Sequence, residues 1–202
     1  MKVITTVVGE LGTNCYLLID EKTNQAAVVD PGFLNDVLLN EIKKYTVQRI
    51  LLTHGHFDHI WEADRLHEML GVPVCAYETE AAFAADDKQN GSHLMMYESI
   101  TCKVHEAFKD GETFQIGEVP VTVLHTPGHT AGGVSYITPD AVFTGDTLMG
   151  YSVGRCDLPT GNSAELRESL KKLAALPGNP DICGGHGPVT TLEDEKRRNP
   201  YL

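Results

Sequence analysis

The residues best suited to chemistry are concentrated in one hexapeptide, His54-Gly55-His56-Phe57-Asp58-His59. It places three imidazoles and a carboxylate within six residues. Imidazole nitrogen and carboxylate oxygen are the ligand atoms of zinc and similar first-row divalent ions. Given the histidine and aspartate content of the chain, a chance occurrence of H-x-H-x-D-H is on the order of one in a thousand. The spacing therefore predicts a metal-binding loop.

Three further turns carry a histidine or an aspartate directly after a predicted strand. They are Thr126-Pro127-Gly128-His129-Thr130, Phe143-Thr144-Gly145-Asp146-Thr147 and Cys183-Gly184-Gly185-His186-Gly187-Pro188. Each turn alone is weak evidence for a metal site, since His129 also fits an ordinary turn and Asp146 also fits a turn or helix cap. Because loops that follow strands gather at one edge of a sheet, we expect all of them to converge. Five imidazoles and two carboxylates are enough for two metal ions with one shared ligand.

The elements that must position these residues alternate in type along the chain. The hexapeptide follows Val47–Leu52, an apolar run typical of a buried strand. Further strands are expected at Val3–Val8, Cys15–Ile19, Ala26–Val29, Val72–Tyr77, Thr113–Ile116, Val119–His125, Gly133–Ile137, Ala141–Thr144 and Asp181–Cys183. Helices are expected at Leu34–Tyr45, Trp61–Leu70, Glu78–Asp87, Ser163–Leu176 and Leu192–Arg198. Two successive sets of strands followed by helices predict an α/β fold with four layers, an αβ/βα sandwich.

The segment 78–100 is the least regular part of the pattern. After its helix it contains Asn90-Gly91-Ser92 and the cluster Leu94-Met95-Met96-Tyr97. A flap over a pocket and a surface excursion with a small core of its own both fit, and base rates favour the second. Trp61 presents a similar choice between a pocket wall and packing on a helix face, and packing is favoured.

Composition places the chain among ordinary globular domains. Its 202 residues are 42% hydrophobic and 22% charged, which predicts one domain spanning 1–202. No apolar run approaches the roughly 20 residues that cross a bilayer. The net charge of -12 disfavours non-specific binding to nucleic acid or anionic membranes. The five cysteines are scattered and lack a C-x-x-C pair, so we expect free thiols and a cytoplasmic location.

The strings H-x-H-x-D-H, T-P-G-H-T, F-T-G-D-T-L and G-H-G-P resemble the metallo-β-lactamase-fold hydrolase superfamily. The chain is most similar to small glyoxalase II-like (hydroxyacylglutathione hydrolase-like) members, a likeness extended by the strings at 13–16, 153–159 and 195–200. The resemblance implies that His54, His56 and His129 hold one metal ion. It implies that Asp58, His59 and His186 hold the other, with Asp146 as the bridge.

The chemistry implied by the resemblance is hydrolysis of a small thioester by a hydroxide that bridges two divalent metal ions. We expect zinc, and iron or manganese also suit these donors. Asp58 would be both a ligand and the proton acceptor. A thiol nucleophile at Cys156 or Cys183 is an alternative, although a structural role is favoured for both. The other histidines, His67, His93, His105 and His125, are expected to be structural or solvated.

The chain departs from full-length glyoxalase II enzymes in two ways. Those enzymes have a C-terminal helical region that contacts glutathione, and we expect this chain to lack it. Two tyrosine positions of the family are Asp157 and Pro188 here. Arg155 does match the family's basic position, so it is the candidate for substrate binding. The thioester is therefore expected to be small, and these residues leave open whether glutathione is its thiol carrier.

Other functions remain open on the same residues. A mononuclear iron persulfide dioxygenase of this fold would need only His54, His129 and Asp146, but such enzymes resemble G-D-A-L where this chain has G-D-T-L. Zinc β-lactamases commonly resemble this fold with cysteine in place of Asp146. An all-nitrogen and oxygen site also suits another small ester, a lactone or a phosphodiester. A non-enzymatic scaffold is the last alternative.

Overall fold

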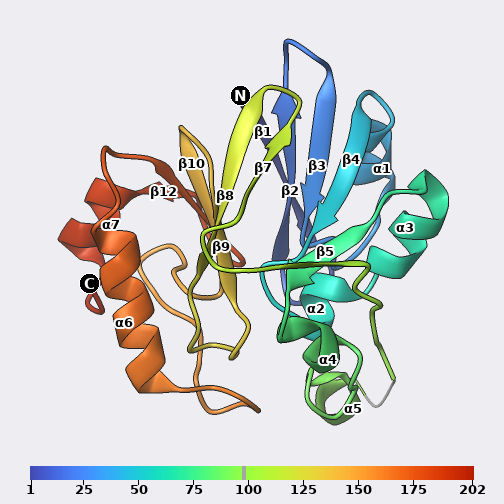
Figure 1. Ribbon diagram of the computed structural model, residues 1–202. Helices are drawn as coiled ribbons and strands as arrows, with labels where there is room; N and C mark the ends of the chain where they lie inside the picture. Colours follow the sequence, from blue (N-terminus) through green and yellow to red (C-terminus); the bar gives the residue numbers. More distant parts are fainter. Residues whose placement is uncertain (97–98) are drawn as a thin grey trace.

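Within residues 1–96 and 99–202, which the computed structural model describes, the strands form two six-stranded sheets (Figure 1). The first sheet holds the strands of the N-terminal half in sequence order: β1 Lys2–Val8, β2 Thr13–Asp20, β3 Gln25–Val29, β4 Thr46–Leu51, β5 Val74–Tyr77 and β6 Glu106–Phe108. β1 to β3 are antiparallel, and β3 to β6 are parallel. The parallel strands therefore all end at the same edge.

The second sheet holds the strands of the C-terminal half. They are β7 Thr113–Ile116, β8 Val119–His125, β9 Val134–Ile137, β10 Ala141–Gly145, β11 Asp181–Gly184 and β12 Thr190–Thr191. β7 to β10 form an antiparallel meander, and β11 joins β10 in parallel. β10 and β11 consequently also end at a common edge.

Helices cover the outer face of each sheet and the edge where the parallel strands end (Figure 1). They are α1 Asp36–Ile42, α2 Phe57–Ile60, α3 Ala63–Leu70, α4 Glu80–Ala84, α5 Ser92–Met95, α6 Ser163–Ala174 and α7 Leu192–Arg198. α1 and α3 lie on the first sheet, and α6 and α7 on the second.

The alternation of side chains along β2 shows how the layers pack. Every residue of β2 is buried. Leu17 and Ile19 pack with Leu38 of α1 on one face, whereas Tyr16 and Leu18 face the second sheet. A strand buried on both faces is the signature of a sandwich with outer helices. The predicted four-layer αβ/βα fold is confirmed.

Most predicted elements are found, with shorter bounds at several ends. The helix expected at Leu34–Tyr45 begins only at Asp36, because the Asn35 side chain caps it by accepting from Leu38 N at 2.8 Å. The helix expected at 78–87 spans only Glu80–Ala84. β6 and β12 were not predicted, since strands of three and two residues carry too little alternation to be recognised.

The irregular segment after α4 packs partly into the molecule. Asn90 is fully buried, and its side chain donates to the carbonyl of Ile100 at 2.7 Å. Met95 borders the cavity at the predicted metal ligands, so the segment is more than a surface excursion. Tyr97, the last residue of the cluster at 94–97, lies outside the described residues. Trp61 packs against the apolar core between the first sheet and its helices. It also lines a cavity, so both of the roles considered for it apply.

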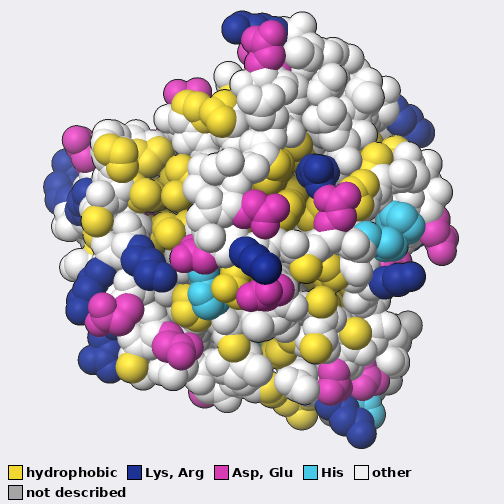
Figure 2. Space-filling model, in the orientation of Figure 1, with side chains coloured by type: hydrophobic (Ala, Val, Ile, Leu, Met, Phe, Trp, Pro, Cys, Tyr) yellow, Lys and Arg dark blue, Asp and Glu magenta, His cyan; other side chains and the backbone are white. Residues whose placement is uncertain are grey.

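The surface carries both signs of charge. Figure 2 shows acidic and basic side chains interspersed over one face, with apolar side chains between them. Among the described residues, no helix has the length and hydropathy needed to cross a membrane. The five cysteines all lie in described segments and are free, as expected.

Candidate metal centre

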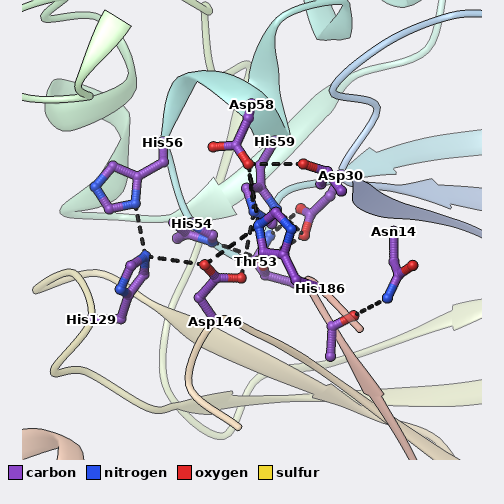
Figure 3. Close-up of polar contacts among 12 residues, drawn as sticks. Asn14, Asp30, Thr53, His54, His56, Asp58, His59, His129, Asp146 and His186 are labelled. Carbon is purple, nitrogen blue, oxygen red and sulfur yellow. Dashed lines mark hydrogen bonds and ion pairs between the residues drawn. The ribbon is translucent and has the colours of Figure 1, made fainter. Parts of the chain in front are cut away.

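All seven predicted ligands lie at one edge of the sandwich, each just beyond a strand (Figure 3). They are His54, His56, Asp58 and His59 after β4, His129 after β8, Asp146 after β10, and His186 after β11. Asp58 and His59 lie in α2, a single turn of helix within the loop. The strand ends of both sheets therefore bring together residues that are far apart in the sequence.

One group consists of the imidazoles of His54, His56 and His129. Their nitrogen atoms lie within 4.8 Å of one another, and all three side chains are buried. Nδ1 of His56 is 2.8 Å from Nε2 of His129 (Figure 3). Three imidazoles at this separation form a donor set suited to a first-row divalent ion.

A second group consists of Asp58, His59 and His186, whose donor atoms also lie within 4.8 Å of one another. Oδ2 of Asp58 is 3.3 Å from Nε2 of His186 and 3.5 Å from Nε2 of His59. The group is less enclosed than the first, because Asp58 and His186 are only partly buried. Its open side faces the cavity.

Asp146 lies between the two groups. Its Oδ2 is 3.6 Å from Nε2 of His129, which belongs to the first group. Its Oδ1 is 3.5 Å from Nε2 of His59, and its Oδ2 is 3.7 Å from Nε2 of His186, both in the second group. A carboxylate in this place would be within reach of ions held by either group.

Unpartnered polar atoms test whether the site suits a metal. Within the described part of the chain, Nε2 of His54, His56 and His59 and Oδ1 of Asp146 are buried without a hydrogen-bond partner. Each such atom costs about 1–3 kcal/mol when it is left unsatisfied. All four belong to predicted ligands, and a divalent cation would satisfy the lone pairs of His54, His59 and Asp146 together, whereas His56 presents Nδ1, not Nε2, to the cluster. The residues present therefore fit a metal centre.

The buried carboxylate of Asp30 orients two candidate ligands. It accepts from the Thr53 backbone N–H at 2.7 Å and from the Thr53 hydroxyl at 2.6 Å. Since that hydroxyl gives its proton to Asp30, it must accept from Nδ1 of His54, 3.1 Å away. Oδ2 of Asp30 also lies 3.0 Å from Nδ1 of His59. Both rings therefore turn Nε2 toward the cluster, which is the role of a supporting hydrogen-bond shell around a metal.

Neither Asp30 nor Thr53 is among the residues singled out from the sequence. A signal for Asp30 was present, because it follows the strand run Ala26–Val29 as the ligands follow theirs. Asp30 also adopts a positive φ of 52° before Pro31, which marks a built turn. Thr53 carries no signal beyond its place before His54.

The first residues of β2 tie the His186 loop to the first sheet. The Asn14 side chain donates to the carbonyls of Gly184 and Gly187 at 3.0 and 2.9 Å. The Tyr16 hydroxyl donates to the same Gly184 carbonyl at 2.7 Å. Thr13 donates to Oδ2 of Asp58 at 2.8 Å. The string at 13–16 thus positions ligands of the second group.

Charged and neutral ligands shift each other's pKa. Burial lowers the pKa of His54 well below its ordinary value, and His59 lowers it further. Burial also lowers the pKa of His59, but the carboxylates of Asp58, Asp30 and Asp146 outweigh it and raise the value to about 10. Burial raises the pKa of Asp58, yet His59 holds it below its usual range. His54 is therefore neutral, as a ligand must be, and the carboxylates of Asp58, Asp30 and Asp146 concentrate negative charge around His59, which favours a cation there.

Arg155, the predicted substrate-binding residue, lies at the rim of a cavity of about 210 Å³ that is lined by five of the seven predicted ligands. Its guanidinium bonds both carboxylate oxygens of Asp157, at 2.6 and 2.7 Å. Its carbonyl oxygen lies 2.7 Å from Nδ1 of His129 and can only accept, so that ring also turns Nε2 to the cluster. Asp157 thus neutralises the cation in the residue's present conformation.

The two cysteines considered as nucleophiles keep their protons. Burial raises the pKa of Cys183 to about 12 and also raises that of Cys156. Because the thiolate is the reactive form, neither residue is activated at neutral pH. Their structural interpretation is supported.

The four remaining histidines lie outside the metal-ligand groups. His67 stacks on His105 with ring centroids 3.9 Å apart, and His125 stacks on Tyr77 at 4.2 Å. His93 is exposed on α5. Their expected structural or solvated roles agree with these contacts.

Known proteins share this sequence pattern. The model of the metallo-beta-lactamase superfamily matches residues 8–186. The chain is 37% identical over 201 residues to the probable metallo-hydrolase YqgX of Bacillus subtilis, covering 96% of this chain and 94% of that protein. It is 32% identical over 196 residues to hydroxyacylglutathione hydrolase GloC of Haemophilus influenzae, covering 94% and 92%.

Solved structures share the fold at similar identity. BLEG-1, a B3 metallo-beta-lactamase, superposes with a TM-score of 0.93 at 33% identity, covering 100% of this chain and 99% of that one. TTHA1623 in a di-iron-bound form superposes with a TM-score of 0.84 at 32% identity, covering 98% and 100%. The chain has two sheets, a converging set of histidine and aspartate loops, and relatives that match it over most of both chains. It belongs to the metallo-beta-lactamase superfamily.

Proposed function

We propose that this metallo-hydrolase is a dinuclear thioesterase of the hydroxyacylglutathione hydrolase type. The observation that carries the proposal is the position of Asp146 between two complete groups of donors. The similarity of the whole chain to a hydroxyacylglutathione hydrolase supports the substrate class. The reaction adds water to the thioester carbonyl and breaks the carbon–sulfur bond, which yields a carboxylic acid and a thiol.

The donors would be divided between two ions. His54, His56 and His129 would hold one, Asp58, His59 and His186 the other, and Asp146 would contact both. Five imidazoles and two carboxylates suit zinc, iron or manganese. When bound, such ions polarise a carbonyl and make hydroxide available near neutral pH.

Asp58 is the proposed proton acceptor. Its carboxylate stays ionised at neutral pH because His59 and the Thr13 hydroxyl stabilise the charged form. It is partly exposed at the cavity that contains the ligands, so an attacking water can reach it. The Thr13 bond fixes the carboxylate in place, so it accepts the proton without having to reorient.

Arg155 is the proposed contact for an anionic thiol carrier. It lies on the cavity rim next to Gly154 and Leu158. Because Asp157 already pairs with it, a carboxylate of glutathione would have to displace that partner. Glutathione is therefore a permitted carrier in this proposal, not a required one.

Two other reactions deserve a direct test. A mononuclear iron persulfide dioxygenase would use only His54, His129 and Asp146, and would leave the second donor group without a role. β-Lactam hydrolysis is raised by the similarity to BLEG-1. The thioesterase and the β-lactamase would use the same two donor groups, so substrates separate them, whereas the dioxygenase differs in both its substrate and its single metal ion.

The purified holoenzyme should be assayed with S-lactoylglutathione, an S-acyl-N-acetylcysteamine, glutathione persulfide and a β-lactam. We expect thiol release from a thioester, at a rate well above that with the lactam. Oxygen consumption on the persulfide without thioester turnover would replace the thioesterase by the dioxygenase. Failure to turn over any of the four would favour a scaffold.

A further inference from the structure

An apolar cavity of about 510 Å³ lies beside the metal-ligand groups, between the β1–β2 turn and α2. Apolar side chains exposed at its rim include Val7, Leu11 and Phe33, with exposed fractions of 63, 50 and 42%. Phe57 and Trp61 line its interior. Several large apolar side chains exposed around one hollow mark a binding site more often than chance exposure does. The volume is that of an ordinary small-molecule pocket.

This apolar cavity is continuous with the site of chemistry. Leu11, Phe57 and Asp58 line both it and the smaller cavity that contains the ligands. Asp58 belongs to the second donor group and lies at the boundary between the two cavities. A substrate whose carbonyl lies over the ligands would therefore direct one of its two arms into the apolar cavity.

Charge decides which arm this is. The charged side chains among the described lining residues are the carboxylates Glu10 and Asp58, and no lysine or arginine lines the cavity there. An anionic group would be repelled and left without a partner. Arg155 instead lies on the ligand cavity, away from the apolar one. A charged thiol carrier fits the Arg155 side, and an uncharged apolar arm fits the other.

We propose that the apolar cavity binds the acyl chain of the substrate, and that this chain is a medium-length aliphatic group, preferred over acetyl or lactoyl. The proposal rests on the thioesterase function proposed above. Phe33 and Leu11 close over the chain from the rim, while Phe57 and Trp61 contact it from within. A medium-length aliphatic chain would bury more apolar surface against these side chains than an acetyl or lactoyl group can.

The kinetic test compares hexanoyl and acetyl thioesters of N-acetylcysteamine, a neutral carrier that leaves Arg155 out of the comparison. A fully buried methylene gains roughly fourfold, so four of them set a ceiling of roughly 200-fold. We expect kcat/KM for hexanoyl to exceed that for acetyl by at least about tenfold, given partial exposure at the rim. Phe33→Ala should reduce this ratio severalfold. Val37→Ala, an exposed apolar residue on α1 outside both cavities, should leave it unchanged.

A binding test needs neither metal nor turnover. Trp61 is the single tryptophan of the chain and lines the cavity, so its emission reports on occupancy. The non-hydrolysable S-hexyl-N-acetylcysteamine should shift the emission to the blue, and S-methyl-N-acetylcysteamine should not. Phe33→Ala should weaken the hexyl titration, with Val37→Ala as the matched control.

The two proposals fail in different ways. Thioester turnover that does not depend on acyl length, or a ratio unchanged in Phe33→Ala, overturns the acyl-chain assignment and leaves the thioesterase intact. Absence of turnover with every thioester contradicts the thioesterase. In that case a hexyl-specific shift that is weakened in Phe33→Ala still supports an aliphatic ligand in this cavity, and the lack of any shift overturns it.

Discussion

At the scale of single residues, the site depends on groups that never touch a substrate. Asp30 accepts hydrogen bonds from Thr53 and His59 and, through the Thr53 hydroxyl, sets the orientation of His54. One carboxylate thus fixes a ligand of each proposed ion. Partners of this kind typically contribute 10- to 100-fold to metal affinity, roughly.

Asp30→Asn should lower metal affinity by about 10- to 100-fold. Asparagine tolerates the φ of 52° at this position, so the turn survives. Its amide nitrogen, however, is a donor. It would face the Thr53 hydroxyl and the His59 N–H, which also donate at this position. Competition with a chromogenic chelator measures the effect. Asp20→Asn, another buried aspartate that caps a turn on β2, is the control, and equal affinities in the two variants would contradict the role of Asp30.

His67→Ala should leave hydrolysis within a few-fold of the wild-type rate. Its ring stacks on His105 on the outer face of the first sheet, away from both ligand groups. The loss should be confined to stability, by about 1 kcal/mol for a partly exposed aromatic pair. Steady-state kinetics and urea unfolding measure the two effects separately. A collapse of turnover in a folded variant would mean that the site has been misplaced.

At the scale of elements, the loops after β10 and β11 approach so closely that a glycine is required. A Cβ on Gly185 would lie 2.1 Å from Oδ1 of Asp146 and 2.7 Å from Cε1 of His59. Neither ligand can retreat, because each is enclosed by the cluster. Gly185 therefore allows the His186 loop to approach one candidate ligand that follows a strand of each sheet.

Gly185→Ala should displace Asp146 and abolish binding of at least one metal ion, while the sheets remain folded. Gly178→Ala is the matched control, since it has a φ of 71° and open space around its Cβ position. That control should cost about 1–2 kcal/mol through backbone strain alone and keep its metal. Elemental analysis and far-UV circular dichroism measure the outcome. Full metal content in Gly185→Ala would contradict the packing described.

Glu80, on α4, links another element to the metal loop. Its carboxylate accepts from the Gly55 N–H at 2.8 Å and is fully buried. Burial raises its pKa to about 7, against the smaller opposing effect of that hydrogen bond. Since the folded pKa lies above the unfolded one, its contribution is present below pH 4.5 and is lost as the pH rises through 7.

Glu80→Gln removes this titration and can still accept from Gly55. The variant should therefore gain stability relative to wild type as the pH rises from 5 to 8, by roughly 2–3 kcal/mol. Urea unfolding at the two pH values measures the difference. Glu78→Gln, at an exposed position close in sequence, is the control variant. An equal difference between Glu80→Gln and wild type at both pH values would refute the buried titration.

The regular elements were predictable where hydrophobic period and length agreed. β2, α6 and α7 have strong patterns or caps, and α7 spans Leu192–Arg198 as predicted. α2 was missed because a four-residue turn inside a metal loop has no apolar period of its own. β6 forms only through pairing with β5, and such pairing is invisible in three residues of sequence.

At the scale of the whole molecule, the site joins two sheets that share no strand. The hexapeptide comes from the first sheet, whereas His129, Asp146 and His186 come from the second. Sequence spacing indicated the ligand types and the loops. The supporting residues Asp30 and Thr53, the apolar cavity and the pairing of Arg155 with Asp157 depend on distances across the sandwich, which no local pattern contains.

The central claim is that loops of both sheets meet at one pair of metal ions that hydrolysis requires. The most direct test is elemental analysis of wild type and Asp146→Ala, with thioester turnover measured before and after chelation. We expect about two metal equivalents in wild type and a loss of activity on chelation that either divalent zinc or iron restores. Asp146→Ala should lose metal and activity together. Turnover that survives complete chelation, or Asp146→Ala that retains both ions, would contradict the account.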